Sequence, residues 1–281
     1  MLAGADLCMM INRGRRKPMN RVGIKILNIA MMKKIFLYAT LILTSLSCFT
    51  TTAGAQGNPA NPYDEAGAKH NAVLANFFNE YSKERIVEEQ MSEKALCEYV
   101  CVQVPMPNCD LLQQVRASEI GQATKQLGLA ETGAYLHAKG LVSSLFAAYT
   151  TKLDRSISLQ MGAGYAALYR AIVAIETNIL ADAGLKASER NTLLLAASVA
   201  RHSGKFWTDL RNETTSYTGL SHINATDETV GDVVKADAAG AVVGAVAGAA
   251  TGPGVVVTSV GGAAVSSTVK AVRDFWGWVF G

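Results

Sequence analysis

The stretch "GAVVGAVAGAATGPG", which runs from Gly240 to Gly254, dominates the C-terminal part of the sequence. Four of its glycines recur at every fourth position: Gly240, Gly244, Gly248 and Gly252. On a helix, residues four apart lie on one face, so these glycines form a face without side chains that a second helix can approach closely. Because each glycine costs a helix about 1 kcal/mol relative to alanine, the regular spacing indicates a packing role.

Pro253 interrupts this run and predicts a turn within it. The uncharged residues on each side of the proline are too few to cross a bilayer, which takes about 20 residues as a helix. We therefore predict that residues 237–268 fold as a Gly/Ala-rich helical hairpin. The second arm begins with the β-branched run "VVVTSV", so a short strand stays open as an alternative there.

Residues 269–281 form an aromatic tail in which Trp276 and Trp278 lie near Lys270 and Arg273. Tryptophan beside basic residues is typical of the membrane interface.

Two functional hypotheses follow. In the first, the glycine face and the tail mediate association with membrane lipid or self-assembly, in the manner of bacteriocin-like peptides. In the second, the protein is a soluble periplasmic or surface binding or structural module, and the hairpin packs on its own body.

The N-terminal part of the sequence predicts export. Residues 31–55 combine a basic start, the apolar run "IFLYATLILTSL" and a small-residue end, which are the three parts of a signal peptide. We expect cleavage after Ala55, and we interpret residues 1–30 as a non-native upstream extension. Cys48 leaves lipidation open as an alternative, which would make the protein an outer-membrane lipoprotein. We expect the mature chain in the periplasm, at the cell surface or outside the cell.

The charge balance of the expected mature chain argues against nucleic-acid binding. The full chain has 26 Lys and Arg against 23 Asp and Glu, but residues 1–55 carry eight of the basic and one of the acidic residues. The remaining 18 basic and 22 acidic residues give a formal net charge of −4. Binding to phosphate backbones relies on basic side chains, so we expect no nucleic-acid partner.

Residues 56–220 predict an all-α body, a bundle of about five to six helices. Apolar residues recur at helical spacing, for example at Leu168, Ile172, Ile175 and Ile179. We expect one helix over residues 110–128 and another over residues 132–153. No stretch of this body alternates convincingly with the period of two that a half-buried strand shows. We expect a polar linker at residues 221–236, between the body and the hairpin.

Three cysteines remain after residue 55: Cys97, Cys101 and Cys109. An exported protein meets an oxidising environment, which favours a disulfide. Cys97 and Cys101 lie one helical turn apart, where a bond between them fits poorly, so we expect one of them to pair with Cys109. Three cysteines without a nearby histidine make an incomplete zinc site, and we expect no metal.

The sequence contains no recognised catalytic motif, and we predict that the protein is not an enzyme. Its four histidines lie far apart in the chain: His70, His137, His202 and His222. Glu176 lies in an otherwise apolar helix, and we expect it to face solvent. We assign no catalytic residue and no cofactor, and no small-molecule ligand is identifiable.

Three segments of the expected mature chain stand out together: "NPYDEAGAKHN" from Asn61, "LLLAASVARHSGKFW" from Leu193 and "DAAGAVVGAVAGAATGPG" from Asp237. With these segments the chain resembles a group of uncharacterised exported bacterial proteins. That group shares an N-P-x-D-x-x-G-x-x-H-N opening and a C-terminal glycine-zipper tail. The resemblance implies export and architecture, and it implies no activity.

If the opening motif is functional, its polar residues are the ones to test: Asn61, Asp64, His70 and Asn71. The structural alternative is that Asp64 caps a helix and that His70 and Asn71 form the polar end of that helix. A third hypothesis, an enzyme that uses Asp64 and His70, requires these side chains to share one pocket with Glu176 or His202.

Overall fold

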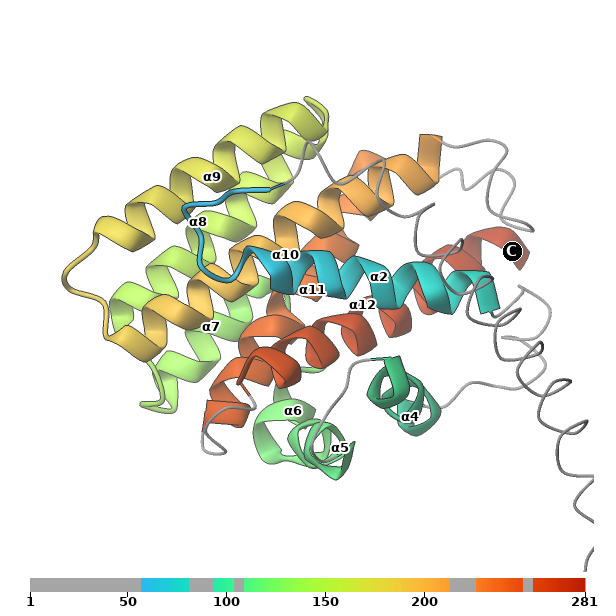
Figure 1. Ribbon diagram of the computed structural model, residues 1–281, viewed down its shortest axis with the longest axis horizontal. Coiled ribbons are helices and arrows are strands. Elements are labelled where there is room, and N and C mark those ends of the chain that lie inside the picture. The colour runs from blue at the N-terminus through green and yellow to red at the C-terminus, as the bar shows by residue number, and fades with distance from the viewer. Residues whose placement is uncertain (1–56, 81–92, 104–108, 213–225, 250–254, 281) are drawn as a thin grey trace, which may run out of the picture. The chain divides into compact units, whose positions relative to one another are not determined.

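The computed structural model describes residues 57–80, 93–103, 109–212, 226–249 and 255–280. Within these ranges the fold is all-α, as the sequence predicts, and no strand is present (Figure 1). The described residues form ten helices: α2 (Asp64–Glu80), α4 (Glu93–Gln103), α5 (Cys109–Ala117), α6 (Glu119–Thr124), α7 (Leu129–Ala138), α8 (Ser144–Met161), α9 (Tyr165–Ala181), α10 (Ala187–Asn212), α11 (Asp227–Gly248) and α12 (Val255–Phe280). The expected signal peptide, the upstream extension, Cys48 and Gly252 lie outside the described residues.

The body contains more helices than the five or six that the sequence predicts. In the described part of the chain, eight helices, α2 and α4 to α10, precede the hairpin. The stretch 110–128 is broken because the Ser118 side chain accepts a backbone hydrogen bond that caps α6. The stretch 132–153 is broken where Gly140 adopts a φ of 69°, a left-handed conformation that favours glycine, and Ser143 then caps α8.

The C-terminal part differs from the prediction in two places. α11 begins at Asp227, so most of the linker expected at residues 221–236 is helical. Thr226 caps the helix with its side chain, and two acidic residues in the first turn match the positive end of the helix dipole. α12 runs without a break through the place where a strand was the alternative and on through residues 269–280, because helical packing outweighs a weak strand preference.

α11 is the central helix of the described structure. It contacts α5, α6, α7, α8, α10 and α12, and every residue from 237 to 245 is buried. A helix that is apolar on all sides belongs in a protein interior or in a membrane. Here other helices of the same chain cover the uncharged run, because the small side chains of alanine and glycine let several helices approach it.

The glycines of α11 face α12. A β-carbon at Gly240 would lie 2.5 Å from the carbonyl oxygen of Gly262, and one at Gly244 would lie 2.1 Å from the carbonyl oxygen of Thr258. A β-carbon at Gly248 would lie 2.1 Å from the hydroxyl oxygen of Thr258. Real β-carbons essentially never approach other atoms within 3.0 Å. The described part of the glycine face is therefore occupied by a helix of the same chain.

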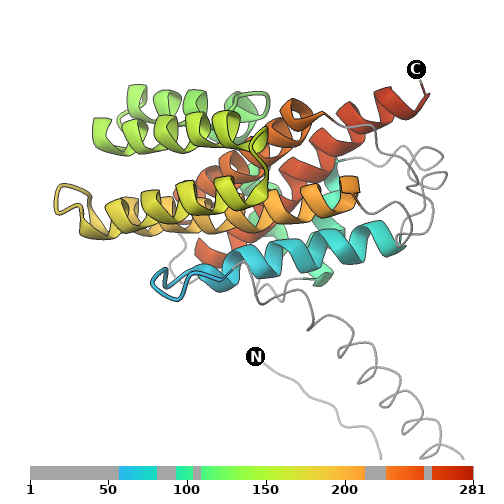
Figure 2. The same ribbon diagram turned by 90° about the horizontal axis from the view of Figure 1, so that it is seen from above.

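The remaining helices pack around the α11–α12 pair. α2 runs alongside α10 and also contacts α12 (Figure 2). α8 packs between α7 and α9, and both α8 and α9 contact α10. α4 and α5 pack against α12. Among the described helices, none combines the length and the apolar character that crossing a membrane requires.

The cysteines of α4 are part of the core. Cys97 and Cys101 are both buried and lie one helical turn apart. No disulfide is found among the described side chains, and the side chain of Cys109 is not one of these. The disulfide with Cys109 therefore stays a prediction.

Candidate functional site

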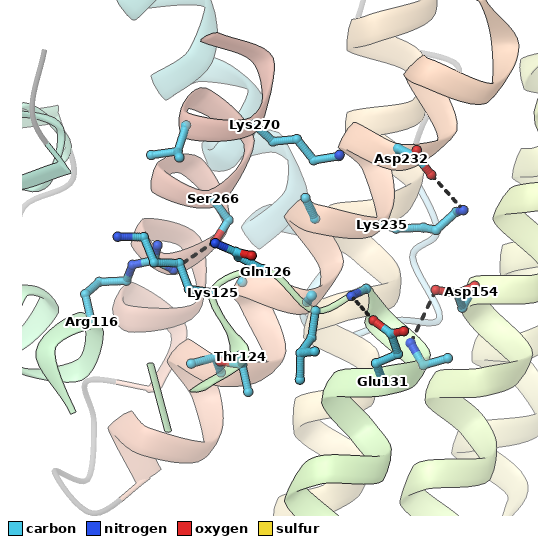
Figure 3. A pocket seen from close by; sticks show the side chains of 18 residues that line it. Arg116, Thr124, Lys125, Gln126, Glu131, Asp154, Asp232, Lys235, Ser266 and Lys270 are labelled. Atoms are coloured by element: carbon cyan, nitrogen blue, oxygen red, sulfur yellow. Dashed lines mark hydrogen bonds and ion pairs between the residues drawn. The ribbon is translucent and has the colours of Figure 1, made fainter. Parts of the chain in front are cut away.

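A pocket of about 470 Å³ lies where three pairs of helices meet: α5–α6, α7–α8 and α11–α12 (Figure 3). Its charged and hydroxyl-bearing lining residues are Arg116, Thr124, Lys125, Glu131, Asp154, Asp232, Lys235, Ser266 and Lys270. Gly240 is also part of the lining. The glycine face of α11 therefore contacts α12 and also borders the pocket. The close α11–α12 contact thus helps to set the shape of this site.

Two acidic side chains hold the start of α7 at the pocket. Glu131 Oε2 accepts a hydrogen bond from the Gly128 backbone N at 3.0 Å, and Asp154 Oδ2 accepts one from the Ala130 backbone N at 3.3 Å. These bonds satisfy N–H groups that a helix start leaves without partners in the helix. The negative charges also match the positive end of the α7 dipole.

Arg116 is the buried cation of the pocket. Arg116 is only 7% exposed, and its Nη1 donates a hydrogen bond to Ser266 Oγ of α12 at 3.0 Å. Lys125 follows α6 and Lys270 lies on α12, so these three of the four basic lining residues come from three separate segments; the fourth, Lys235 of α11, is paired with Asp232. Guanidinium and ammonium groups are the side-chain groups that bind carboxylates and phosphates.

A second set of polar side chains, which we call the buried cluster, shares no lining residue with the pocket. Its members are Asn58, Asn61, Asp64, His70, Asn71, Glu176, Arg201, His202, Ser203 and Asp237. They join the opening motif to α9, α10 and α11.

Glu176 lies at the centre of one half of the buried cluster. It is fully buried, so the prediction that it faces solvent is wrong. Asn58 Nδ2 donates to Glu176 Oε2 at 2.6 Å, and Asn61 Nδ2 donates to Oε1 at 2.7 Å. Arg201 Nη2 lies 3.4 Å from Glu176 Oε1 and also binds Asp64. The local pattern of α9 could not show this, because every partner of Glu176 lies elsewhere in the chain.

The ion pairs keep Asp64 and Arg201 charged. Burial acts to raise the pKa of the Asp64 carboxyl, but the Arg201 guanidinium outweighs it, and the pKa lies below its usual value. Burial likewise acts to lower the pKa of Arg201, and the carboxylates of Glu176 and Asp64 outweigh it and raise that pKa. The Arg201 guanidinium carbon also lies 5.8 Å from the centre of the Tyr169 ring, a cation–π arrangement.

His202 lies at the edge of the buried cluster and is neutral at neutral pH. Burial, together with the charge of Arg201, lowers the pKa of its imidazole to about 4. Its Nε2 lies 3.3 Å from Asp64 Oδ1 and donates to it when neutral. The His202 backbone carbonyl accepts a hydrogen bond from Asn71 Nδ2 at 2.8 Å. His202 therefore links α10 to two residues of the opening motif.

Asp237 of α11 forms the other half of the buried cluster. Its Oδ2 accepts hydrogen bonds from Ser203 Oγ and from Trp207 Nε1, the latter at 3.2 Å. His70 Nε2 lies 3.5 Å from Asp237 Oδ1, and both side chains are fully buried. His70 is thus an interior residue of α2 that meets α11, and the prediction that it forms a polar helix end is wrong.

The buried cluster is closed to solvent at most of its charged groups. Glu176, Arg201, His70 and Asp237 are fully buried, and the Asp64 side chain is only 25% exposed. A substrate has no direct access to fully buried groups, whereas removing one partner would leave an uncompensated charge inside the protein. The opening motif does meet Glu176 and His202, as the third hypothesis requires, but it does so in the interior and not in the pocket.

The residues predicted for membrane contact or self-association divide into two sets. Gly240, Gly244 and Gly248 contact α12 within the chain. Gly252 and the side chains of Trp276 and Trp278 lie outside the described part. The described glycines therefore have a packing role, while the role of the aromatic end stays a prediction.

The described residues contain no group of three or more His, Cys, Asp or Glu side chains that could hold a metal ion. Comparison of the chain with models of protein families, with curated proteins and with solved structures gives no match. The resemblance stated for the opening motif stays a prediction, and the proposal for function rests on the residues of the site.

Sequence reasoning did not single out Arg116 and Lys125 as site residues, and it placed Lys270 at a membrane interface. They come from three segments without a shared motif, so no local pattern identifies them as neighbours. Arg201 did carry a signal, because it directly follows the uncharged, mostly apolar run "LLLAASVA" of residues 193–200. A charge in such a place is usually paired when it is buried.

Proposed function

We propose that the chain is an exported, non-enzymatic helical binding module that holds a small polar ligand with an anionic group in the pocket of Figure 3. The observation that carries this proposal is Arg116, a buried arginine that lines a pocket of about 470 Å³ together with Lys125 and Lys270. Pockets of roughly 300–1,000 Å³ with a few well-placed polar groups are typical of small-molecule sites. Charge-assisted hydrogen bonds from these three residues would hold a carboxylate or phosphate group.

Export is supported by the sequence of residues 31–55, which has the parts of a signal peptide. The proposal that the chain is not an enzyme is supported by the burial of the ion pair between Arg201 and Glu176. Arg201 and Glu176 are fully buried, and they hold the opening segment on α9 and α10. Asn58 and Asn61 donate to the two oxygens of Glu176, and Arg201 pairs with Glu176 and Asp64, which are the contacts of a structural ion pair.

The packing of α11 favours a binding module over membrane association or self-assembly through the glycines. Those alternatives need the glycine face to be open to lipid or to a second copy of the chain. Gly240 and Gly244 already meet the backbone of α12, so exposing them would require the hairpin to leave the core. A chain that ends before residue 236 would lack most of α11 and all of α12, which are core helices. Loss of membrane binding in such a chain would therefore not show that the glycine face contacts lipid.

Isothermal titration calorimetry of the full chain at low ionic strength tests the proposal. The probes are inorganic phosphate and N-acetyl-dialanine, a small carboxylate. We expect Lys125→Gln and Lys270→Gln each to weaken binding about tenfold, because each removes one charge-assisted contact. Lys186→Gln removes the same charge from an exposed residue outside the pocket and leaves binding unchanged. Unchanged affinity in both pocket variants, or no binding of either probe, refutes the proposal.

A further inference from the structure

The pocket is electrically polarised. In Figure 3, Arg116 and Lys125 lie on one side of it, and Glu131 and Asp154 lie on the other. The basic side is built by α5, the turn after α6 and α12, from which Lys270 extends; the acidic side is built by α7 and α8. A pocket for a plain anion gains nothing from carboxylates on the facing wall, because like charges repel.

The carboxylates of the acidic side each keep one oxygen for a ligand. Glu131 and Asp154 use Oε2 and Oδ2 to bind the start of α7. Neither Glu131 Oε1 nor Asp154 Oδ1 accepts a hydrogen bond from the described residues. Asp232, by contrast, is paired with Lys235 of the same helix at 2.9 Å and adds little net charge. The two remaining oxygens suit an ammonium group, which offers three donors.

Apart from the pair Asp232 and Lys235, the residues that α11 contributes to the lining are apolar. Ala236, Ala239 and Val243 contribute small side chains, and Gly240 contributes none. Val269 of α12 adds a further apolar group. Such a surface accepts the uncharged middle of a ligand whose two ends are charged.

We infer that the ligand is a zwitterion with a carboxylate and an ammonium group: a free amino acid or a short peptide. Its carboxylate meets Arg116, Lys125 and Lys270, and its ammonium group meets Glu131 and Asp154. This inference rests on the proposed function and deepens it. A ligand with only one of the two charges would make no charge-assisted contact with the opposite wall, and its affinity would be lower.

Calorimetry with four matched dipeptides tests the inference on the full chain. Dialanine carries both charges, N-acetyl-dialanine only the negative one, dialanine amide only the positive one, and N-acetyl-dialanine amide neither. We expect dialanine to bind at least about tenfold more tightly than either singly charged form, since it gains one more charge-assisted contact. Alanine and trialanine, titrated in the same way, distinguish a free amino acid from a longer peptide as the preferred form.

Two amide variants identify the wall that recognises the ammonium group. Glu131→Gln and Asp154→Asn keep a carbonyl oxygen that can accept the hydrogen bond from the start of α7, but they remove the charge. We expect the double variant to lower the affinity for dialanine at least about tenfold and to leave that for N-acetyl-dialanine unchanged or higher. Glu65→Gln on α2, whose side chain is 78% exposed, is the control and leaves both affinities unchanged. A thermal melt by circular dichroism confirms that each variant is folded.

The outcomes separate the inference from the proposed function. If N-acetyl-dialanine binds as tightly as dialanine, the inference is wrong and the anion-binding function stands. If no dipeptide binds but phosphate does, the inference is wrong and the anion-binding function stands. If neither phosphate nor any dipeptide binds, both are wrong. If dialanine binds best and the double variant abolishes its advantage, the zwitterion assignment is supported.

Discussion

Replacing Gly244 by alanine tests the contact on which the fold and the pocket both depend. The added methyl group would lie 2.1 Å from the Thr258 carbonyl oxygen and 3.0 Å from the Ser259 Cα. Because real β-carbons essentially never lie within 3.0 Å of another atom, α11 and α12 would have to separate by about 1 Å. Backbone atoms cannot rotate away as a side chain can, so we place the cost at the upper end of overpacking, about 3 kcal/mol.

Alanine also favours a helix over glycine by about 1 kcal/mol, so the expected net loss of stability for Gly244→Ala is about 2 kcal/mol. The matched control is Gly231→Ala in the same helix. A β-carbon at Gly231 would lie 3.4 Å from Met161 Cγ, an ordinary van der Waals contact. This variant keeps the gain in helix propensity, and we expect it to be more stable than the native chain by up to about 1 kcal/mol.

Thermal and urea unfolding of the full chain, followed by far-UV circular dichroism, measures both effects. For a domain of this size, about 1 kcal/mol corresponds to a change in Tm of about 2–4 °C. We expect Tm to fall by about 4–8 °C for Gly244→Ala and to rise by up to about 4 °C for Gly231→Ala. Equal Tm values for the two variants would refute the reasoning, because the glycine face would then not contact α12. Membrane association through that face would become the better hypothesis.

Three further predictions concern the buried cluster and a helix cap. Arg201→Met leaves Glu176 as an uncompensated buried charge, and urea unfolding should show a loss of about 3–5 kcal/mol; a loss below about 1 kcal/mol contradicts a buried pair. The pKa of His202 is about 4 in the folded chain against 6.5 for the free side chain, so the unfolded state binds more protons between these values. Stability should therefore fall by about 3 kcal/mol from pH 6.5 to pH 4, and His202→Asn should remove this component of the slope. Ser118→Ala removes the cap of α6 and should cost about 1 kcal/mol in urea unfolding, whereas no change would mean that the cap is not formed in solution.

Much of the helical fold could be predicted because helix formation has a local signal. The face formed by Leu168, Ile172, Ile175 and Ile179 is buried, as its spacing indicates. The breaks at Ser118 and Gly140 were missed, although serine is a helix cap and glycine is a helix breaker. Apolar periodicity on both sides of each break concealed it, which explains why the helix count was too low.

The candidate site was much less predictable. The opening motif pointed to four residues that do belong to the buried cluster, but no local rule predicts that Glu176 is buried and bound by Asn58 and Asn61. Burial of a carboxylate is favourable only when distant residues supply its partners. The same limit applies to the pocket, since Arg116 and Glu131 face each other only after α5 and α7 have packed on α11.

The sequence by itself determined that the described chain is helical and that α11 carries a face of glycines, because both follow from residue spacing along one helix. Only the tertiary structure decided that this face meets α12 and that Asp237 is buried against α2 and α10. The physical reason is that periodicity reports which side of a helix is apolar or small, but not what covers it. Whether an uncharged helix meets lipid, a second copy or its own chain depends on contacts between residues far apart in sequence.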